Sequence, residues 1–300
     1  MLNSDQFTFQ ELGEGVWAAI ARPGAGASSN SGIVDTGLSS LVFDTSMTPR
    51  SARELRSAAR ILSGKEPLEA VNSHWHLGHT LGNRLFGGCT VRATRVTHDL
   101  LGRYGVNVEA QVNDPAWSRS AADAEEVRDR EGRPLYREEL TSAAAARRDL
   151  GESRDAVSLR PPDEIFSGRF VYPGRRAVMI VEGAGHSESD TVLFYPDEEV
   201  MFTGDLVVVD CHPDLRSSDP DRWLEALARI EKARPRLLVP GHGPVGDLGA
   251  CARVAAYIRR IREIARAPDP PALPEEFSQW SRPSLFAQNV AALRAAQKRR

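Results

Sequence analysis

The sequence predicts an α/β fold, a two-sheet sandwich with a helical insertion at about residues 114–155. Three observations support this prediction. Short apolar runs bounded by glycine, serine and aspartate alternate with helical stripes in both halves of the chain, and the stretch between the halves is charged and rich in alanine. The 300 residues, 41% of them hydrophobic, are enough to bury a large core. We therefore expect residues 1–300 to form one domain.

The first half begins with three expected strands and a helix. The strands are apolar runs between turn residues, at residues 15–20, 32–35 and 40–44. The helix should begin near residue 48, because apolar residues recur at i, i+4 and i+7 from Leu55 and Pro49 suits a first turn. A further strand at residues 68–71 runs directly into the segment NSHWHLGHTL, which places that segment on a loop at a strand end.

The second half repeats the alternation after the insertion. The insertion has helical propensity and little strand potential, and its position between the halves suggests a lid over a substrate pocket. Strands are then expected at residues 168–172, 177–181, 191–195, 199–202 and 236–239. Helices are expected where Trp223, Val254 and Leu285 each begin an apolar stripe of helical spacing.

Composition narrows the class of protein. The net charge of −3 comes with no basic stripe, so we expect no nucleic-acid partner. No run approaches the roughly 20 apolar residues that span a bilayer, and the start lacks a secretory pattern, so we expect no membrane partner and a cytoplasmic location. Cys89, Cys211 and Cys251 are odd in number and lack a CxxC pair, which argues against disulfides and thiolate zinc sites. Nothing in the sequence specifies an oligomeric state.

Histidines gather in loop-like segments beside strand ends. His74, His76 and His79 share six positions, while His186 and His242 each follow a glycine. Alternate residues of an extended segment point the same way, so His74 and His76 can hold one ion together. A single loop histidine is more often a hydrogen-bonded structural residue, but this combination, with Asp205 after an apolar strand, indicates a metal centre. Imidazole suits zinc and iron, and a carboxylate can bridge two ions.

In these segments the chain resembles the metallo-β-lactamase-fold hydrolases. The family pattern is HxHxDH, then a Gly-His with a downstream Asp, a strand ending in Gly-Asp, and a late Gly-His. Here the pattern falls, in order, on His74, His76, His79, His186 with Asp190, Asp205 and His242. Softer matches are SNSG at residues 29–32, FDT at residues 43–45 and Gly-Asn at residues 82–83. The resemblance implies an αββα sandwich with a metal site at one edge of the two sheets.

The resemblance also implies a role for each ligand. His74, His76 and His186 would hold a first metal, His79 and His242 a second, and Asp205 would bridge the two. Gly78 stands where the family has a carboxylate ligand of the second metal. Losing a charged ligand should lower metal affinity by at least about 10- to 100-fold. We therefore expect one tightly held ion, Zn²⁺, and a second that is weak or absent, and Gly78→Asp should raise the metal content toward two.

Other side chains near the motifs have predicted roles. Glu188, Asp210 and Cys211 are the nearby groups that could replace the missing carboxylate. Trp75, between two ligands, is expected to face away from the metal and to pack in the core.

The expected chemistry is hydrolysis of an ester, thioester, lactone or amide-like bond in a small-molecule substrate, by a metal-held hydroxide. The candidate catalytic residues are Asp205 as proton acceptor, His79 beside it, and His212. His212, in DCHP after Asp205, could hold a substrate carboxylate or protonate a leaving group.

Two alternatives stay open. A degenerate binding protein of the same fold would explain Gly78, although every other ligand is retained. A mononuclear iron oxygenase or another lyase-type enzyme would need only two histidines and Asp205 as a facial triad. Elemental analysis distinguishes iron from zinc, and hydrolysis of a substrate panel with and without chelator distinguishes an enzyme from a binding protein.

Overall fold

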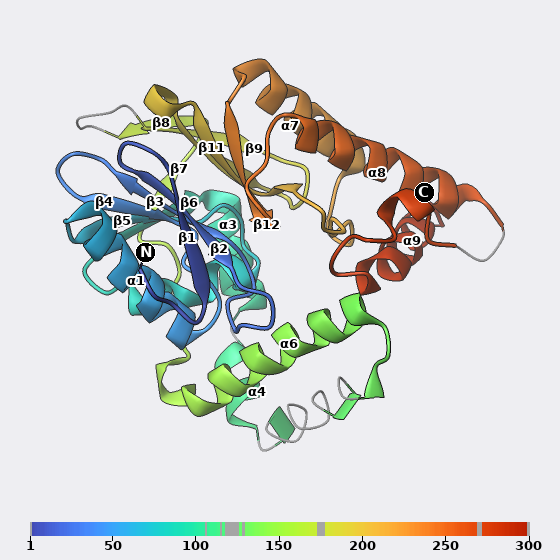
Figure 1. The fold of residues 1–300 in the computed structure, drawn as a ribbon, viewed down its shortest axis with the longest axis horizontal. Coiled ribbons are helices and arrows are strands. Elements are labelled where there is room, and N and C mark those ends of the chain that lie inside the picture. The colour runs from blue at the N-terminus through green and yellow to red at the C-terminus, as the bar shows by residue number, and fades with distance from the viewer. Residues whose placement is uncertain are drawn as a thin grey trace.

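The computed structural model describes residues 2–105, 107–114, 116–117, 126–127, 130–172, 178–268 and 272–298. Two sheets face each other, with α1 outside one and α7 and α8 outside the other (Figure 1). The first sheet has seven strands in the order β1 Phe7–Gly13, β2 Val16–Ala21, β3 Ser31–Asp35, β4 Ser40–Phe43, β5 Pro67–Val71, β6 Thr90–Thr94 and β7 Glu164–Phe166. The second has five, in the order β12 Leu237–His242, β11 Val200–Val208, β10 Asp190–Tyr195, β9 Val178–Gly183 and β8 Arg169–Tyr172.

The first sheet changes from antiparallel to parallel pairing at β4. Strands β1 to β4 form an antiparallel meander, and β4 to β7 pair in parallel. The crossover between β4 and β5 is α1 Pro49–Ser63, which begins at a capping box of Thr48 with Ser51 and ends at Gly64 with φ 69°. Its apolar stripe, including Leu55, is buried against the outer face of the sheet. This is the helix that the sequence predicts.

The core lies in two layers, between the sheets and beneath the outer helices. Phe43 of β4 meets Phe202 of β11 between the sheets, with ring centroids 5.9 Å apart. On the other side of the second sheet, Trp223 of α7 Pro220–Ala233 and Ile258 of α8 Gly249–Arg266 are fully buried. The layers are thus helix, sheet, sheet, helix, and the predicted fold class is confirmed.

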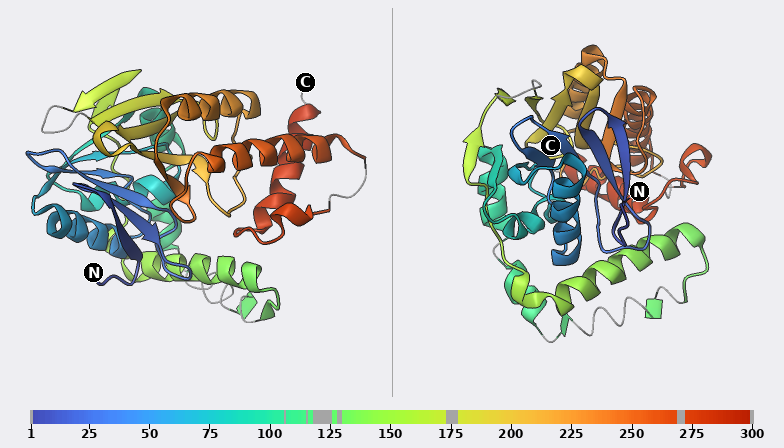
Figure 2. Two further views of the ribbon diagram at one scale, coloured as in Figure 1. Left: turned by 45° about the horizontal axis from the view of Figure 1, so that its top comes forward. Right: turned by 60° about the vertical axis from the view of Figure 1, so that its left-hand side comes forward.

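The insertion is helical where the structure describes it. It contains α4 Val108–Asn113 and α6 Pro134–Glu152, and α3 Arg95–Tyr104 precedes it. Residues 115, 118–125 and 128–129 of the predicted insertion lie outside the described residues. Helix α6 lies along the side of the sandwich, with its first residues toward α9 Ser284–Gln297 and its last near α4 (Figure 1). Figure 2 shows the same helix from two further sides. The carboxylate of Glu139 accepts hydrogen bonds from the amide and hydroxyl of Ser284, so the insertion is joined to the C-terminal segment. Its function as a lid stays a prediction.

Three strands and the length of a fourth were not anticipated. β1 and β7 lie at the edges of the first sheet, where β1 is largely exposed on one face and β7 has only three residues, and β6 lies between β5 and β7. β11 extends nine residues and remains buried throughout, past the Thr-Gly-Asp at which the sequence predicts its end. In the part of the chain that the structure describes, no helix is both long and apolar enough to cross a bilayer.

Candidate metal centre

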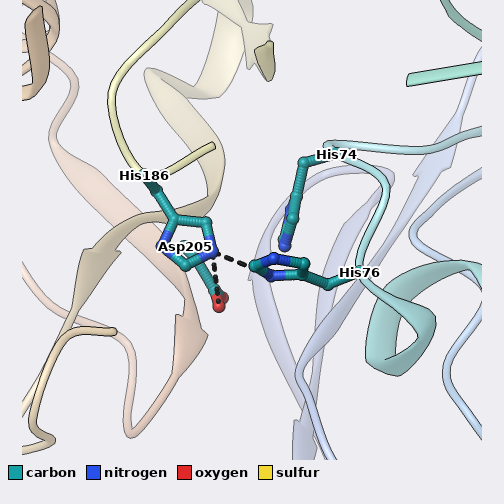
Figure 3. A group of neighbouring side chains, drawn as sticks. All are labelled: His74, His76, His186 and Asp205. Carbon is teal, nitrogen blue, oxygen red and sulfur yellow. Dashed lines mark hydrogen bonds and ion pairs between the residues drawn. The ribbon is translucent and has the colours of Figure 1, made fainter. Parts of the chain in front are cut away.

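Six candidate ligands meet at one edge of the two sheets. His74 and His76 follow β5, and His79 lies in the short helix α2 Leu77–Thr80. The other three come from the second sheet: His186 from the loop between β9 and β10, Asp205 from β11, and His242 from the end of β12. Figure 3 shows His74 and His76 reaching from one side toward His186 and Asp205 on the other. The two sheets thus each contribute half of the site.

Four of these side chains form a first group, made of His74, His76, His186 and Asp205. One ligand atom from each lies within 4.8 Å of all the others. His186 Nε2 is 3.0 Å from His76 Nδ1 and 3.5 Å from Asp205 Oδ2 (Figure 3). Three imidazoles and one carboxylate at this separation are a donor set that zinc or iron accepts.

Asp205 also belongs to a second group with His79 and His242. His79 Nε2 lies 3.3 Å from Asp205 Oδ1, and His242 Nε2 lies 3.4 Å from Asp205 Oδ2. The carboxylate therefore stands between the two groups. Among the described residues, this second group has three members, one fewer than the first.

The donor atoms fit a metal ion. His74 Nε2 is a buried atom without a hydrogen-bond partner among the described residues, whereas both oxygens of Asp205 face imidazole nitrogens at 3.3–3.5 Å. Buried polar atoms are nearly always paired, so an unpartnered ring nitrogen in this group indicates a partner such as an ion. His74 is fully buried, so bulk solvent does not supply that partner.

Burial sets the protonation of the first group. Burial is the largest cause and the neighbouring imidazoles add to it, and together they hold the pKa of His74 well below its usual range and lower that of His76 to about 3. Both rings are therefore neutral at pH 7. A neutral imidazole offers its lone pair to a metal without first losing a proton, so the first group is ready to bind.

The second group holds a proton instead. Burial would lower the pKa of His79, but the carboxylates of Asp205 and Asp44 raise it to about 10. Burial would raise the pKa of Asp205, but His242 and His79 hold it well below its usual range. His79 and Asp205 are therefore an imidazolium and a carboxylate in the metal-free protein. An ion entering the second group must displace the His79 proton, which weakens its binding near neutral pH.

Asp44 orients the histidines on the side of the first sheet. Its carboxylate accepts from His79 Nδ1 at 2.7 Å, and from the amide and hydroxyl of Ser73 at 2.7 and 2.8 Å. The Ser73 hydroxyl lies 2.8 Å from Nδ1 of His74. Such partners fix the ring orientation of a ligand histidine. The sequence alone assigned no function to Asp44, although it belongs to the FDT segment, which matches the family.

Two glycines make room for Asp205. A Cβ on Gly241 would lie 1.9 Å from Asp205 Oδ1, and Gly204 has φ 51° at an irregular pairing of β11 with β12. The prediction that Asp205 ends its strand is wrong, because β11 continues to Val208. The side chain reaches the site from within a strand whose register shifts at this point.

His212 lies in a separate aromatic cluster. Its Nδ1 is 3.0 Å from the hydroxyl of Tyr257, and its ring contacts Trp280 edge-on. Burial lowers its pKa to about 4. Within the described ranges, His212 belongs to neither ligand group, and its catalytic role stays a prediction.

The side chains suggested as replacements for the missing carboxylate have other surroundings. Glu188 accepts from Trp75 Nε1 at 2.9 Å, Asp210 has an exposed side chain, and Cys211 is buried at an isolated bridge with Ser281. None of the three belongs to a ligand group in the described part of the chain.

The interpretation of Trp75 as core packing is wrong. Trp75 is only partly buried, and its ring lies 4.5 Å from that of His76 and 5.0 Å from that of Tyr104, which is 52% exposed. The side chain therefore lies beside the site, because the turn into α2 brings it to the surface.

The sandwich and its paired His/Asp groups define a class, the αββα proteins built to hold metal ions at one edge of two sheets. Comparison with known families shows to which family of this class the chain belongs. The family model of the metallo-beta-lactamase superfamily matches residues 24–242, and the chain belongs to this superfamily.

Solved structures share the fold at low sequence identity. A metallo-beta-lactamase from Pontibacter korlensis is 17% identical and superposes with a TM-score of 0.61, covering 85% of this chain and 99% of that one. DIM-1 metallo-beta-lactamase is 16% identical with a TM-score of 0.58, covering 86% of this chain and 99% of that one. These likenesses concern the fold. Together with the His/Asp groups, membership of the superfamily supports a metal-dependent hydrolase.

Proposed function

We propose that the protein hydrolyses an ester, thioester, lactone or amide-like bond in a small molecule, with one Zn²⁺ held by His74, His76, His186 and Asp205. The observation that carries the proposal is the first group itself, with the unpartnered buried Nε2 of His74, the neutral imidazoles of His74 and His76, and one carboxylate. A divalent ion bound there lowers the pKa of a coordinated water toward about 7 and polarises a carbonyl oxygen.

The remaining chemistry belongs to the chain's own residues. Asp205 is a carboxylate at neutral pH and stands between the two groups, so it can accept a proton from the attacking water. His79 keeps its proton while the second group holds no ion, and its Nε2 lies 3.3 Å from Asp205 Oδ1. Its imidazolium can stabilise negative charge on the substrate or protonate the leaving group. Asp44 holds the opposite ring nitrogen, so Nε2 stays directed at the site.

Two further functions share the same fold. Gly78 favours a binding protein that has lost catalysis, because the second group then lacks the carboxylate that the family has at this position. The first group's nitrogen and oxygen donors would also accept iron, which keeps an oxygenase as a third proposal.

A substrate panel tests the proposal. Chromogenic esters, thioesters, lactones and β-lactams should include at least one that the purified protein hydrolyses, with the activity lost after chelation and restored by Zn²⁺. The matched control is the chelated protein with Mg²⁺ restored, which should stay inactive because Mg²⁺ prefers oxygen ligands. Hydrolysis that resists chelation, or activity restored only by iron under oxygen, would contradict a zinc hydrolase.

A further inference from the structure

The hydroxyl of Ser28 lies over Gly78. Ser28 belongs to the loop between β2 and β3, and Gly78 lies in α2 between His76 and His79. A Cβ built on Gly78 would be 2.8 Å from Ser28 Oγ, closer than two such atoms normally approach. The space in which a side chain at residue 78 would begin is thus taken by Ser28.

The two segments are held in this register by a hydrogen bond. The hydroxyl of Ser29, next to Ser28, donates to the carbonyl oxygen of Gly78 at 2.8 Å. Gly78 cannot therefore move away from the loop without breaking that bond. Ser28, by contrast, could turn its hydroxyl aside by rotation about a single side-chain torsion.

Ser28 Oγ is itself buried and has no hydrogen-bond partner in the described part of the chain. A buried hydroxyl without a partner destabilises a fold, so its presence here calls for an explanation. The position explains it, because Gly78 separates a histidine of the first group from a histidine of the second. The hydroxyl stands where the side chain of the second group's missing ligand would start.

We propose that Ser28 and Gly78 act as one unit that limits the His79–Asp205–His242 group to weak metal binding. The proposal deepens the proposed function, since it explains why one ion is held and the other is not. Gly78 removes the ligand, and Ser28 must leave its present rotamer before a restored side chain at residue 78 has room. Accordingly, Gly78→Asp alone should raise the affinity for the second ion less than the same carboxylate would if Ser28 did not lie beside it.

A four-protein cycle tests the unit: wild type, Gly78→Asp, Ser28→Ala and the double variant, each titrated with Zn²⁺ against a chromophoric chelator. The backbone of Gly78 is not in the left-handed region, so aspartate is tolerated there. The second equivalent should bind about 10-fold more tightly, or better, in the double variant than in Gly78→Asp, comparable to the loss of one supporting group. Ser28→Ala alone should bind the second equivalent as weakly as wild type. Ser31→Ala is the control, because Ser31 Oγ is also buried and unpartnered among the described residues but does not lie against Gly78.

The outcomes separate this proposal from the function on which it rests. Two results would overturn the role of Ser28. In the first, Gly78→Asp and the double variant bind the second Zn²⁺ with equal affinity. In the second, adding Ser31→Ala to Gly78→Asp raises the affinity for the second Zn²⁺ as much as adding Ser28→Ala does. A wild-type protein that does not bind a first equivalent of Zn²⁺ tightly would instead overturn the proposed function. Circular dichroism of all variants shows whether each is folded, and a double variant that is folded yet binds only one ion also refutes the unit.

Discussion

Asp205→Asn is expected to remove the tightly bound metal ion and to lower kcat/KM by about 1,000-fold or more. Asp205 is the one residue shared by both groups, and its carboxylate lies 3.3–3.5 Å from a nitrogen of His79, His186 and His242. The amide has nearly the same shape but neither the negative charge nor the ability to accept a proton. A bound metal contributes several kcal/mol of charge stabilisation, and each 1.36 kcal/mol is about a factor of ten in rate.

The measurement is metal content together with hydrolysis of the substrate found in the panel. Asp210→Asn is the matched control, because Asp210 follows β11 by two residues but has an exposed side chain outside both groups. It should retain the wild-type metal content and activity. A folded Asp205→Asn variant with the full metal content and rate would show that the groups are not a catalytic metal centre.

Asp44→Asn is expected to weaken metal binding by about 10- to 100-fold, although Asp44 is in neither ligand group. The substitution removes the charge that holds His79 Nδ1 at 2.7 Å and that anchors Ser73 beside His74. Asparagine tolerates the left-handed backbone at this position, where φ is 61°, so the loop should keep its course. The pKa of His79 should fall from about 10, because one of its two carboxylate partners is gone.

Metal competition titrations and a histidine NMR titration measure these two effects. The pKa shift also has a consequence for stability. A raised pKa means that the interaction stabilises the metal-free fold below the unfolded value of about 6.5 and that this stabilisation is lost as pH rises through about 10. Asp44→Asn should therefore destabilise the metal-free protein most below neutral pH. Asp35→Asn, which breaks an ion pair with Lys65, is the control and should leave metal affinity unchanged; an unchanged affinity in folded Asp44→Asn would contradict the orienting role.

Periodicity and turn residues predict most of the fold. The stripe from Leu55 and the proline at residue 49 place α1 correctly, since amphipathic spacing and a first-turn proline are local properties. The strands β1, β6 and β7 were missed, because β1 is exposed, β7 is very short and β6 has only two apolar residues among its five, so none has a distinct apolar pattern. The end of β11 was misplaced because Gly204 and Asp205 are typical turn residues, yet the register shift with β12 accommodates them inside a buried strand.

The candidate ligands were easier to predict than their surroundings. His74, His76, His79, His186, Asp205 and His242 stand in recognisable spacings, and the structure brings all six together in two groups. Asp44 contacts His79, and Ser28 lies against Gly78, across segments distant in sequence, which spacing does not encode. The surface position of Trp75 depends likewise on the turn into α2 and on the partner Glu188.

Elemental analysis of the protein, purified without added metal and dialysed against a weak chelator, measures how many metal ions the two groups hold. The first group is complete, whereas the second has Gly78 in place of a further carboxylate and carries a protonated His79, so the protein should retain about one equivalent of zinc per chain. Two tightly retained equivalents would contradict the account of Gly78 and Ser28. No retained metal in a folded protein would contradict the metal centre itself.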